Sequence, residues 1–211
     1  MTGRPLETLP ATLLIFPLEG ALVLPRGHLP LNIFEPRYLD MVRDAMAGAR
    51  LIGMIQPKTD DELYSIGGLG KIQQFSETDD GRFEILLGGL MRFRVSEELS
   101  VTTAYRQVRA DYEPFMDDLK TPAPLDATTR AALEQGLKTY LDAEGLSADW
   151  DAVQRSDDES LVNTLAAVCP FASAEKQALL EADDLARRAA TLEALMRFST
   201  GDDVSSDRKI H

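Results

Sequence analysis

Short apolar runs separated by turn-forming residues dominate the first half of the chain. Thr12–Phe16 and Arg50–Gln56 have the length and composition of buried strands, and Pro57 ends the second. Asp80-Gly81 lies between apolar runs and predicts a hairpin. The other expected strands are Leu22–Leu24, Gly70–Phe75, Arg82–Leu87, Met91–Val95 and Thr102–Tyr112. Strands so numerous and closely spaced favour a barrel or sandwich.

A proline-rich stretch from Phe16 to Tyr38 leads from the first strand into a predicted helix. It is mainly extended, with His28 expected in a loop, because each proline fixes φ and removes a backbone donor. Pro36 suits the first turn of a helix, where its missing N–H costs nothing. Apolar residues at helical spacing predict a helix over 36–47, with Gly48 as its C-cap glycine. These residues are Tyr38, Met41, Val42, Ala45 and Met46.

Helical spacing replaces the strand pattern after Pro114, and four apolar stripes follow in residues 133–141, 161–168, 179–180 and 185–196. Pro170 ends the second stripe, and Ser173 is a candidate cap for the third helix. The pattern predicts an α+β protein, with a β-rich, barrel-like N-terminal lobe over 1–116 and a C-terminal helical bundle over 126–200. A linker is expected over 117–125, and a flexible tail over 201–211.

Charge and composition narrow the function classes. The net charge of −13 divides into 13 − 18 = −5 over residues 1–120 and 9 − 17 = −8 over residues 121–211. Nucleic acids and anionic membranes are not expected partners, because both need a basic face. No apolar run approaches the roughly 18 residues of a membrane span. The single cysteine, Cys169, fits a reducing compartment and is expected to be a small buried side chain, so the chain is predicted to be cytoplasmic. The oligomeric state stays open.

The residues offer no catalytic or cofactor site. Gly67–Lys71 differs from a phosphate loop, because Ser65 replaces the first glycine and Ile72 the hydroxyl residue, so a glycine-rich turn into a strand is expected. The two histidines, His28 and His211, support neither a catalytic triad nor a metal cluster. We therefore expect no catalytic residue, no metal and no cofactor, and predict that the chain is not an enzyme.

Charged residues that suggest chemistry have simpler structural explanations. Carboxylates cluster at Asp60–Glu62, Asp79-Asp80 and Asp157–Glu159, which are expected in a loop, in a hairpin turn and at a helix start. Arg37 could anchor an anion, but we expect it to tether the helix start to a neighbouring acid or carbonyl. Tyr38 is then expected to pack inward.

Six blocks carry a resemblance to a known family. They are FPLEG (16–20), LPLNIFEPRY (29–38), GGLGKIQQF (67–75), ILLGGLMRFRV (85–95), LVNTLAAVCPF (161–171) and EKQALLEADDLARRAATL (175–192). With them the chain resembles the N-terminal, substrate-binding domain family of ATP-dependent Lon protease. The resemblance implies a PUA-like β-rich lobe joined to a helical lobe, in agreement with the pattern. In Lon proteases this region precedes ATPase and protease modules, so the chain is expected to be a stand-alone member without them.

The resemblance favours a non-catalytic module that binds unfolded or exposed polypeptide segments, and a protease component is a second candidate partner. The residues expected to line an apolar groove are Phe34, Tyr38, Phe75, Met91 and Phe115. Two alternatives stay open. One is an adaptor or assembly protein that binds a specific folded partner, and the other is a small-molecule binder that uses a pocket in the β lobe.

Overall fold

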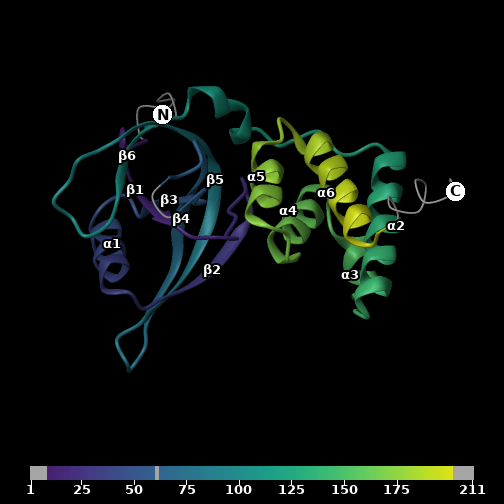
Figure 1. The fold of residues 1–211 in the computed structure, drawn as a ribbon, viewed down its shortest axis with the longest axis horizontal. Helices are drawn as coiled ribbons and strands as arrows, with labels where there is room; N and C mark the ends of the chain where they lie inside the picture. The colour runs from purple at the N-terminus through teal and green to yellow at the C-terminus, as the bar shows by residue number, and fades with distance from the viewer. Residues whose placement is uncertain (1–8, 60–61, 202–211) are drawn as a thin grey trace, which may run out of the picture. The chain divides into compact units, whose positions relative to one another are not determined.

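The structure, a computed structural model, describes residues 9–59 and 62–201. The chain divides into two compact units between Thr121 and Pro122, and each is described by itself (Figure 1). In the described residues, the first contains a sheet and one α-helix, and the second contains helices and no strand. This combination confirms the predicted α+β class. The division lies within the stretch 117–125 that the sequence predicts to be a linker.

Six strands of the first unit form one sheet in the order β2-β5-β4-β3-β1-β6. Strand β5 also pairs with β6, so the sheet closes on itself in a barrel-like ring. Strand β2 stands outside this ring, and β5 is its only partner in the described part of the chain. The strands are β1 (Thr12–Pro17), β2 (His28–Ile33), β3 (Leu51–Ile55), β4 (Ile66–Glu77), β5 (Phe83–Glu98) and β6 (Gln107–Asp111).

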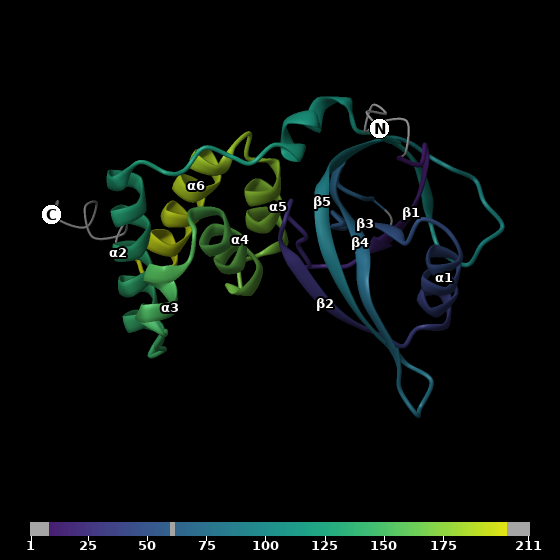
Figure 2. The ribbon, with the colours of Figure 1, turned by 180° about the vertical axis from the view of Figure 1, so that it is seen from behind.

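The predicted hairpin at Asp80-Gly81 is confirmed between β4 and β5 (Figure 2). Gly81 has φ of +81°, a conformation that glycine adopts without steric cost. The turn is closed by the Thr78 hydroxyl, which accepts the Arg82 backbone N–H, and by an Asp80–Arg82 ion pair. Irregular register along β4 and β5 bends both long strands, which lets β5 pair with β2 at one end and β6 at the other.

Two apolar clusters stabilise this unit, one inside the closed sheet and one beneath helix α1 (Pro36–Ala47). The helix starts at Pro36, and its predicted buried face is confirmed at Tyr38, Met41, Val42 and Ala45. The Tyr38 ring packs inward against Phe16, with 4.1 Å between ring centroids. The inner cluster comprises Leu13, Ile15, Leu51, Ile55, Leu69, Met91, Phe93, Val108, Tyr112 and Phe115.

The glycines at 67–70 lie within β4, so the turn expected there is wrong. A Cβ on Gly68 would lie 2.1 Å from the Val23 carbonyl oxygen, and one on Gly89 would lie 1.9 Å from that of Leu24. The glycines are therefore required where the segment containing Val23 and Leu24 crosses the strands. This segment, predicted as a strand, is a loop with buried side chains.

Three other predictions of local structure need correction. His28 is the first residue of β2 instead of a loop residue. Met91–Val95 belongs to the long strand β5. Only 107–111 of the predicted strand Thr102–Tyr112 is extended, because the Thr103 hydroxyl donates to the Tyr105 carbonyl and closes a turn before it. The 3-10 helix η2 (Glu113–Leu119) then extends into the stretch predicted to be a linker.

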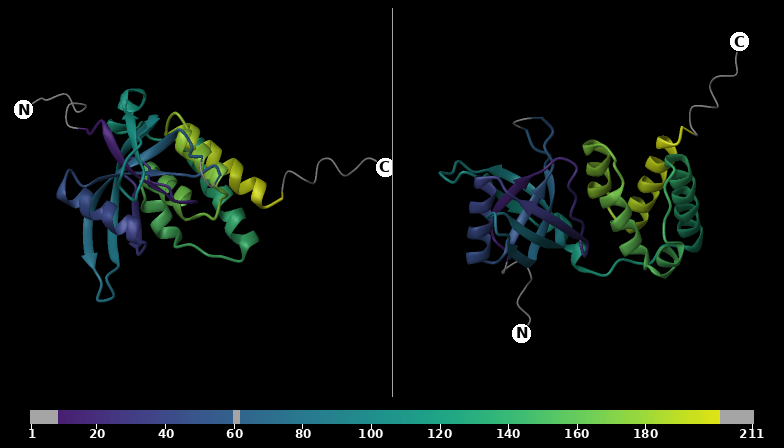
Figure 3. Two further views of the ribbon diagram at one scale, coloured as in Figure 1. Left: turned by 60° about the vertical axis from the view of Figure 1, so that its left-hand side comes forward. Right: turned by 90° about the horizontal axis from the view of Figure 1, so that it is seen from below.

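The described part of the second unit, residues 122–201, contains five helices, of which α2 and α6 lie side by side (Figure 3). The four predicted stripes form α2, α4, α5 and α6, whereas α3 has six residues and is too short for a periodic pattern. Ser173 is the first residue of α5 rather than its cap, which is Ala172. The helices are α2 (Ala127–Glu144), α3 (Trp150–Arg155), α4 (Asp158–Val168), α5 (Ser173–Glu181) and α6 (Leu185–Ser199).

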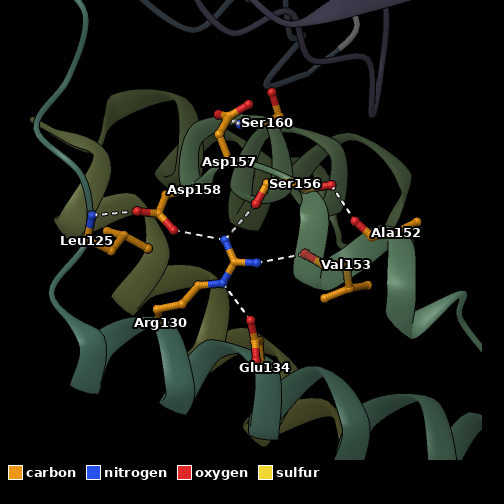
Figure 4. A network of polar contacts seen from close by, with 9 residues as sticks. All are labelled: Leu125, Arg130, Glu134, Ala152, Val153, Ser156, Asp157, Asp158 and Ser160. Carbon is orange, nitrogen blue, oxygen red and sulfur yellow. Dashed lines mark hydrogen bonds and ion pairs between the residues drawn. The ribbon is translucent and has the colours of Figure 1, made fainter.

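Arg130 on α2 connects three of these helices through one guanidinium group (Figure 4). It donates to the carboxylates of Glu134 at 2.6 Å and Asp158 at 2.8 Å. It also donates to the backbone carbonyls of Val153 at 2.7 Å and Ser156 at 3.2 Å, near the end of α3. One side chain therefore links both α3 and α4 to α2.

Candidate functional site

A groove of about 530 Å³ crosses strands β2, β5 and β4 of the first unit. Its lining follows the register of the sheet, in three rows of one residue from each strand. The middle row is apolar, and the other two add polar side chains. The rows are Pro30–Leu86–Gln74, Leu31–Ile85–Phe75 and Asn32–Glu84–Ser76. Since the strands supply whole rows, the groove is part of the barrel framework.

Phe75 is the large aromatic side chain of this groove, and 41% of its surface is exposed. Its ring contacts the buried ring of Phe83, with 5.0 Å between centroids and 60° between ring planes. The Arg43 guanidinium of α1 lies over the Phe83 ring at 5.2 Å. Phe75 is thus held on one side by the core and open to solvent on the other, as an aromatic contact residue requires.

Phe34 is the second exposed aromatic residue in this part of the unit, at 64% exposure. It follows Ile33, which pairs with Phe83 at the end of β2. Of the five residues expected to line an apolar groove, Phe34 and Phe75 are therefore accessible to a ligand. Tyr38, Met91 and Phe115 are 6%, 1% and 7% exposed and belong to the core, so they do not offer a surface to a ligand.

A polar hollow of about 420 Å³ lies elsewhere in the first unit, beside Arg37, Lys58 and Arg106. The expected tether of Arg37 is confirmed, because it pairs with Glu35 at 2.7 Å. Arg106 pairs with Glu98 at 2.6 Å, and this hydrogen bond lowers the pKa of the Glu98 carboxyl. Both arginines of this hollow are thus paired with carboxylates, which weakens their attraction for an anionic ligand.

An apolar cleft of about 360 Å³ lies in the second unit, between α2, α3 and α4. Leu146 and Val168 line this cleft and have 58% and 67% of their surfaces exposed. Its other apolar lining residues are Leu137, Tyr140, Leu141, Ala148, Ala152, Val153, Leu161, Leu165, Cys169 and Pro170. The apolar stripes in the sequence do not predict this cleft, because they mark which face of a helix is apolar but not where two such faces fail to meet.

Within the described residues 9–59 and 62–201, the His, Cys, Asp and Glu side chains do not form a metal site. No three His, Cys, Asp or Glu residues gather there as a metal would require. Cys169 is buried, and burial raises the pKa of its thiol. The acidic turn at Asp79-Asp80 is confirmed, and Asp157 caps α4 by accepting the Ser160 backbone N–H at 2.9 Å. In the cluster at Asp60–Glu62, Asp60 and Asp61 lie outside the described residues. No helix in the described ranges has the length and apolarity of a membrane span.

A comparison of the sequence with known protein families gives the class of this protein. Residues 12–197 match the family model of the ATP-dependent protease La (LON) substrate-binding domain. This match spans most of the chain, which therefore belongs to that family.

Particular relatives confirm this assignment. The chain is 25% identical to Lon protease of Flavobacterium johnsoniae over 196 residues, which cover 87% of this chain and 23% of the relative. It is 28% identical to Lon protease 2 of Sorangium cellulosum over 188 residues, or 82% of this chain and 23% of the relative. The chain thus spans about a quarter of the length of these relatives.

Solved structures show the same fold. The Lon N-terminal domain protein from Xanthomonas campestris superposes with a TM-score of 0.64 at 24% identity, over 87% of this chain and 97% of that one. The N-terminal domain of Mycobacterium avium complex Lon protease gives 0.62 at 19% identity, over 90% and 98%. At these identities the likeness concerns the fold alone.

Proposed function

We propose that the chain is a non-catalytic module that binds unfolded or exposed polypeptide segments through the groove across β2, β5 and β4. The observation that carries this proposal is the half-exposed ring of Phe75, which sits in an apolar row and rests on the buried ring of Phe83. Membership of a substrate-binding family supports it. We place the module in the cytoplasm, since its single cysteine suits a reducing compartment.

The groove favours contacts from side chains over strand addition. Among the described residues, no strand pairs with the edge of β2 that faces away from β5, and such an edge is a template for pairing with an extended chain. Pro30 lies in the middle of β2 and has no backbone N–H, so it interrupts any ladder on that edge. Apolar side chains of a client would instead lie against Phe75 and the partly buried Leu31. Such binding tolerates many sequences, because burial of apolar area is not directional.

The test is a titration of a labelled, permanently denatured protein, read by fluorescence anisotropy. We expect micromolar-scale affinity that survives moderate salt, because apolar burial is not screened. Phe34→Ala and Phe75→Ala should each weaken binding about fivefold, since an aromatic contact contributes on the order of 1 kcal/mol. Phe198→Ala is the matched control, because Phe198 is also 64% exposed but lies on α6 of the other unit.

Two results would overturn the proposal. One is no binding of the denatured chain even at high protein concentration. The other is an equal affinity of the Phe34, Phe75 and Phe198 variants, which would locate the contact away from the groove. Thermal unfolding of each variant shows whether it is folded, and all three side chains are exposed enough for truncation to leave the core intact.

A further inference from the structure

The apolar cleft of the second unit is large enough for side chains of another molecule. An apolar cavity of roughly 150 Å³ holds a benzene-sized group, and this cleft measures about 360 Å³. Its volume therefore accommodates about two apolar side chains. Leu146 and Val168 remain more than half exposed at the cleft, so a ligand that covered them would gain the free energy of burying their surface.

The walls of this cleft are held in place by several independent contacts. The Arg130 guanidinium fixes α3 and α4 against α2 (Figure 4). The Asp149 side chain caps α3 by accepting the Ala152 backbone N–H at 3.0 Å. Gly145 ends α2 with φ of 66°, and the Leu146 N–H donates to the Leu141 carbonyl at 2.8 Å. The cleft is therefore formed before a ligand arrives, which lowers the entropic cost of binding.

The charge around the cleft restricts what it binds. Residues 142–151 run from the end of α2 to the start of α3 and contain four carboxylates, of which Asp149 lines the cleft. These acids are Asp142, Glu144, Asp149 and Asp151. With the flanking cations Lys138 and Arg155 included, the stretch remains net negative. A second copy of the chain would bring an equally acidic rim against this one. Its C-terminal residues 202–211 contain three Asp against one Arg and one Lys, so they are not complementary either.

We propose that this cleft binds a cationic, apolar segment of a partner protein, with two neighbouring apolar side chains in the cleft and flanking Lys or Arg beside the 142–151 carboxylates. The attraction is both apolar and electrostatic, so the affinity falls with salt while part of it persists. The ligand differs in chemistry from the one proposed for the β groove, and its site lies in a different unit. A failed test of one proposal therefore leaves the other unaffected.

The direct test uses synthetic peptides with one Leu-Leu pair flanked by lysines, and the same peptide with glutamates in their place. Trp150 is the only tryptophan of the chain and is the first residue of α3, beside Asp149 at the cleft, so its fluorescence reports binding without a label. We expect the lysine peptide to bind at least tenfold more tightly than the glutamate peptide at low salt. Equal affinity for the two peptides, or no binding of either, would overturn the proposal.

Substitutions locate the contact. Val168→Asp should reduce the affinity for the lysine peptide at least tenfold, and Asp142→Lys/Glu144→Lys should shift the preference toward the glutamate peptide. Phe198→Asp is the control, because Phe198 has nearly the same exposure as Val168 and also lies in the last turn of a helix of this unit. An equal loss in the Phe198 and Val168 variants would overturn the proposal. So would a dimer in sedimentation experiments that Val168→Asp abolishes, since the occupant would then be a second copy.

Discussion

Asp118 holds the guanidinium of Arg92 in a two-pronged ion pair inside the β-rich unit. The Arg92 Nε and Nη2 atoms donate to the carboxylate at 2.9 and 2.8 Å, and the Arg92 backbone N–H donates to the same group at 2.8 Å. The side chains of Arg92 and Asp118 are 6% and 8% exposed. The ring of Phe115 lies 4.9 Å from the guanidinium carbon. The pair thus ties η2 to β5.

Removal of one partner of this pair should be costly. We expect Asp118→Ala to lower the free energy of unfolding by about 3–5 kcal/mol, because it leaves a buried guanidinium without its carboxylate. The double variant Arg92→Met/Asp118→Leu should regain much of that loss, since it removes both charges. Denaturant titrations of the single and double variants measure the coupling. A loss below about 1 kcal/mol for Asp118→Ala would show that water replaces the carboxylate.

Two glycine-to-alanine substitutions should have opposite effects. Gly68→Ala places a Cβ 2.1 Å from the Val23 carbonyl oxygen, which is backbone and cannot rotate away, so stability should fall by at least about 1–3 kcal/mol. Gly136 lies inside α2, and a Cβ there would lie 3.3 Å from Cγ of the flexible Glu193 side chain. Gly136→Ala should therefore raise the stability of the helical unit by up to about 1 kcal/mol. Unfolding curves of both variants check the two signs.

Local spacing in the sequence was enough for the elements that local physics decides. The helix at 36–47 needs only Pro36 and its apolar face, and the hairpin needs only Asp80-Gly81. The errors arose where distant contacts decide. Leu22–Leu24 has the composition of a strand, but its role is to cross the strands where Gly68 and Gly89 leave space. No pattern within a short window contains that information.

The sequence indicates which residue types could line an apolar groove, but not which of those residues are exposed. Phe34 and Phe75 are exposed, whereas Met91 and Phe115 face the barrel interior. Phe75 pairs with the buried residue Ile85 only because of the irregular register between Ile72 and Gln74, which alters the alternation of faces along β4. An irregularity of this kind depends on pairing with β5, so the sequence of β4 alone does not reveal it.

Alkaline pH should destabilise the β-rich unit through its buried tyrosines. Burial raises the pKa of Tyr112 to about 12, above the roughly 10 of a free tyrosine. Folding therefore favours the neutral phenol, and its contribution is fully present below about pH 10 and is lost as the pH rises toward 12. Tyr112→Phe should flatten this part of the stability curve. At pH 7 it should cost only about 1 kcal/mol, for the lost hydrogen bond to the Pro10 carbonyl.

Unfolding measurements on parent and variant from pH 7 to pH 11.5 check this prediction. The two curves should run parallel up to about pH 9 and converge above it, because only the parent loses stability through this group. Parallel curves over the whole range would show that the pKa of Tyr112 is the same in the folded and the unfolded protein. Burial also raises the pKa of Tyr105, with a further contribution from its hydrogen bond to Asp44. The variant should therefore retain part of the alkaline slope.

Arg130 should control the shape of the helical unit and of its cleft. Arg130→Ala removes the donor to the carbonyls of Val153 and Ser156 and to two carboxylates, and it should lower stability by about 2 kcal/mol. Arg130→Lys keeps the charge but lacks the planar fork that reaches four acceptors, so it should recover less than half of the loss. Amide hydrogen exchange in α3 is the sharper measurement, since a helix of six residues opens readily when a tertiary contact is lost. We expect α3 amides to exchange faster in both variants while those of α6 change little.

A uniform increase across the unit would mean instead that Arg130 contributes to global stability without fixing α3, and the cleft would then depend on apolar packing alone.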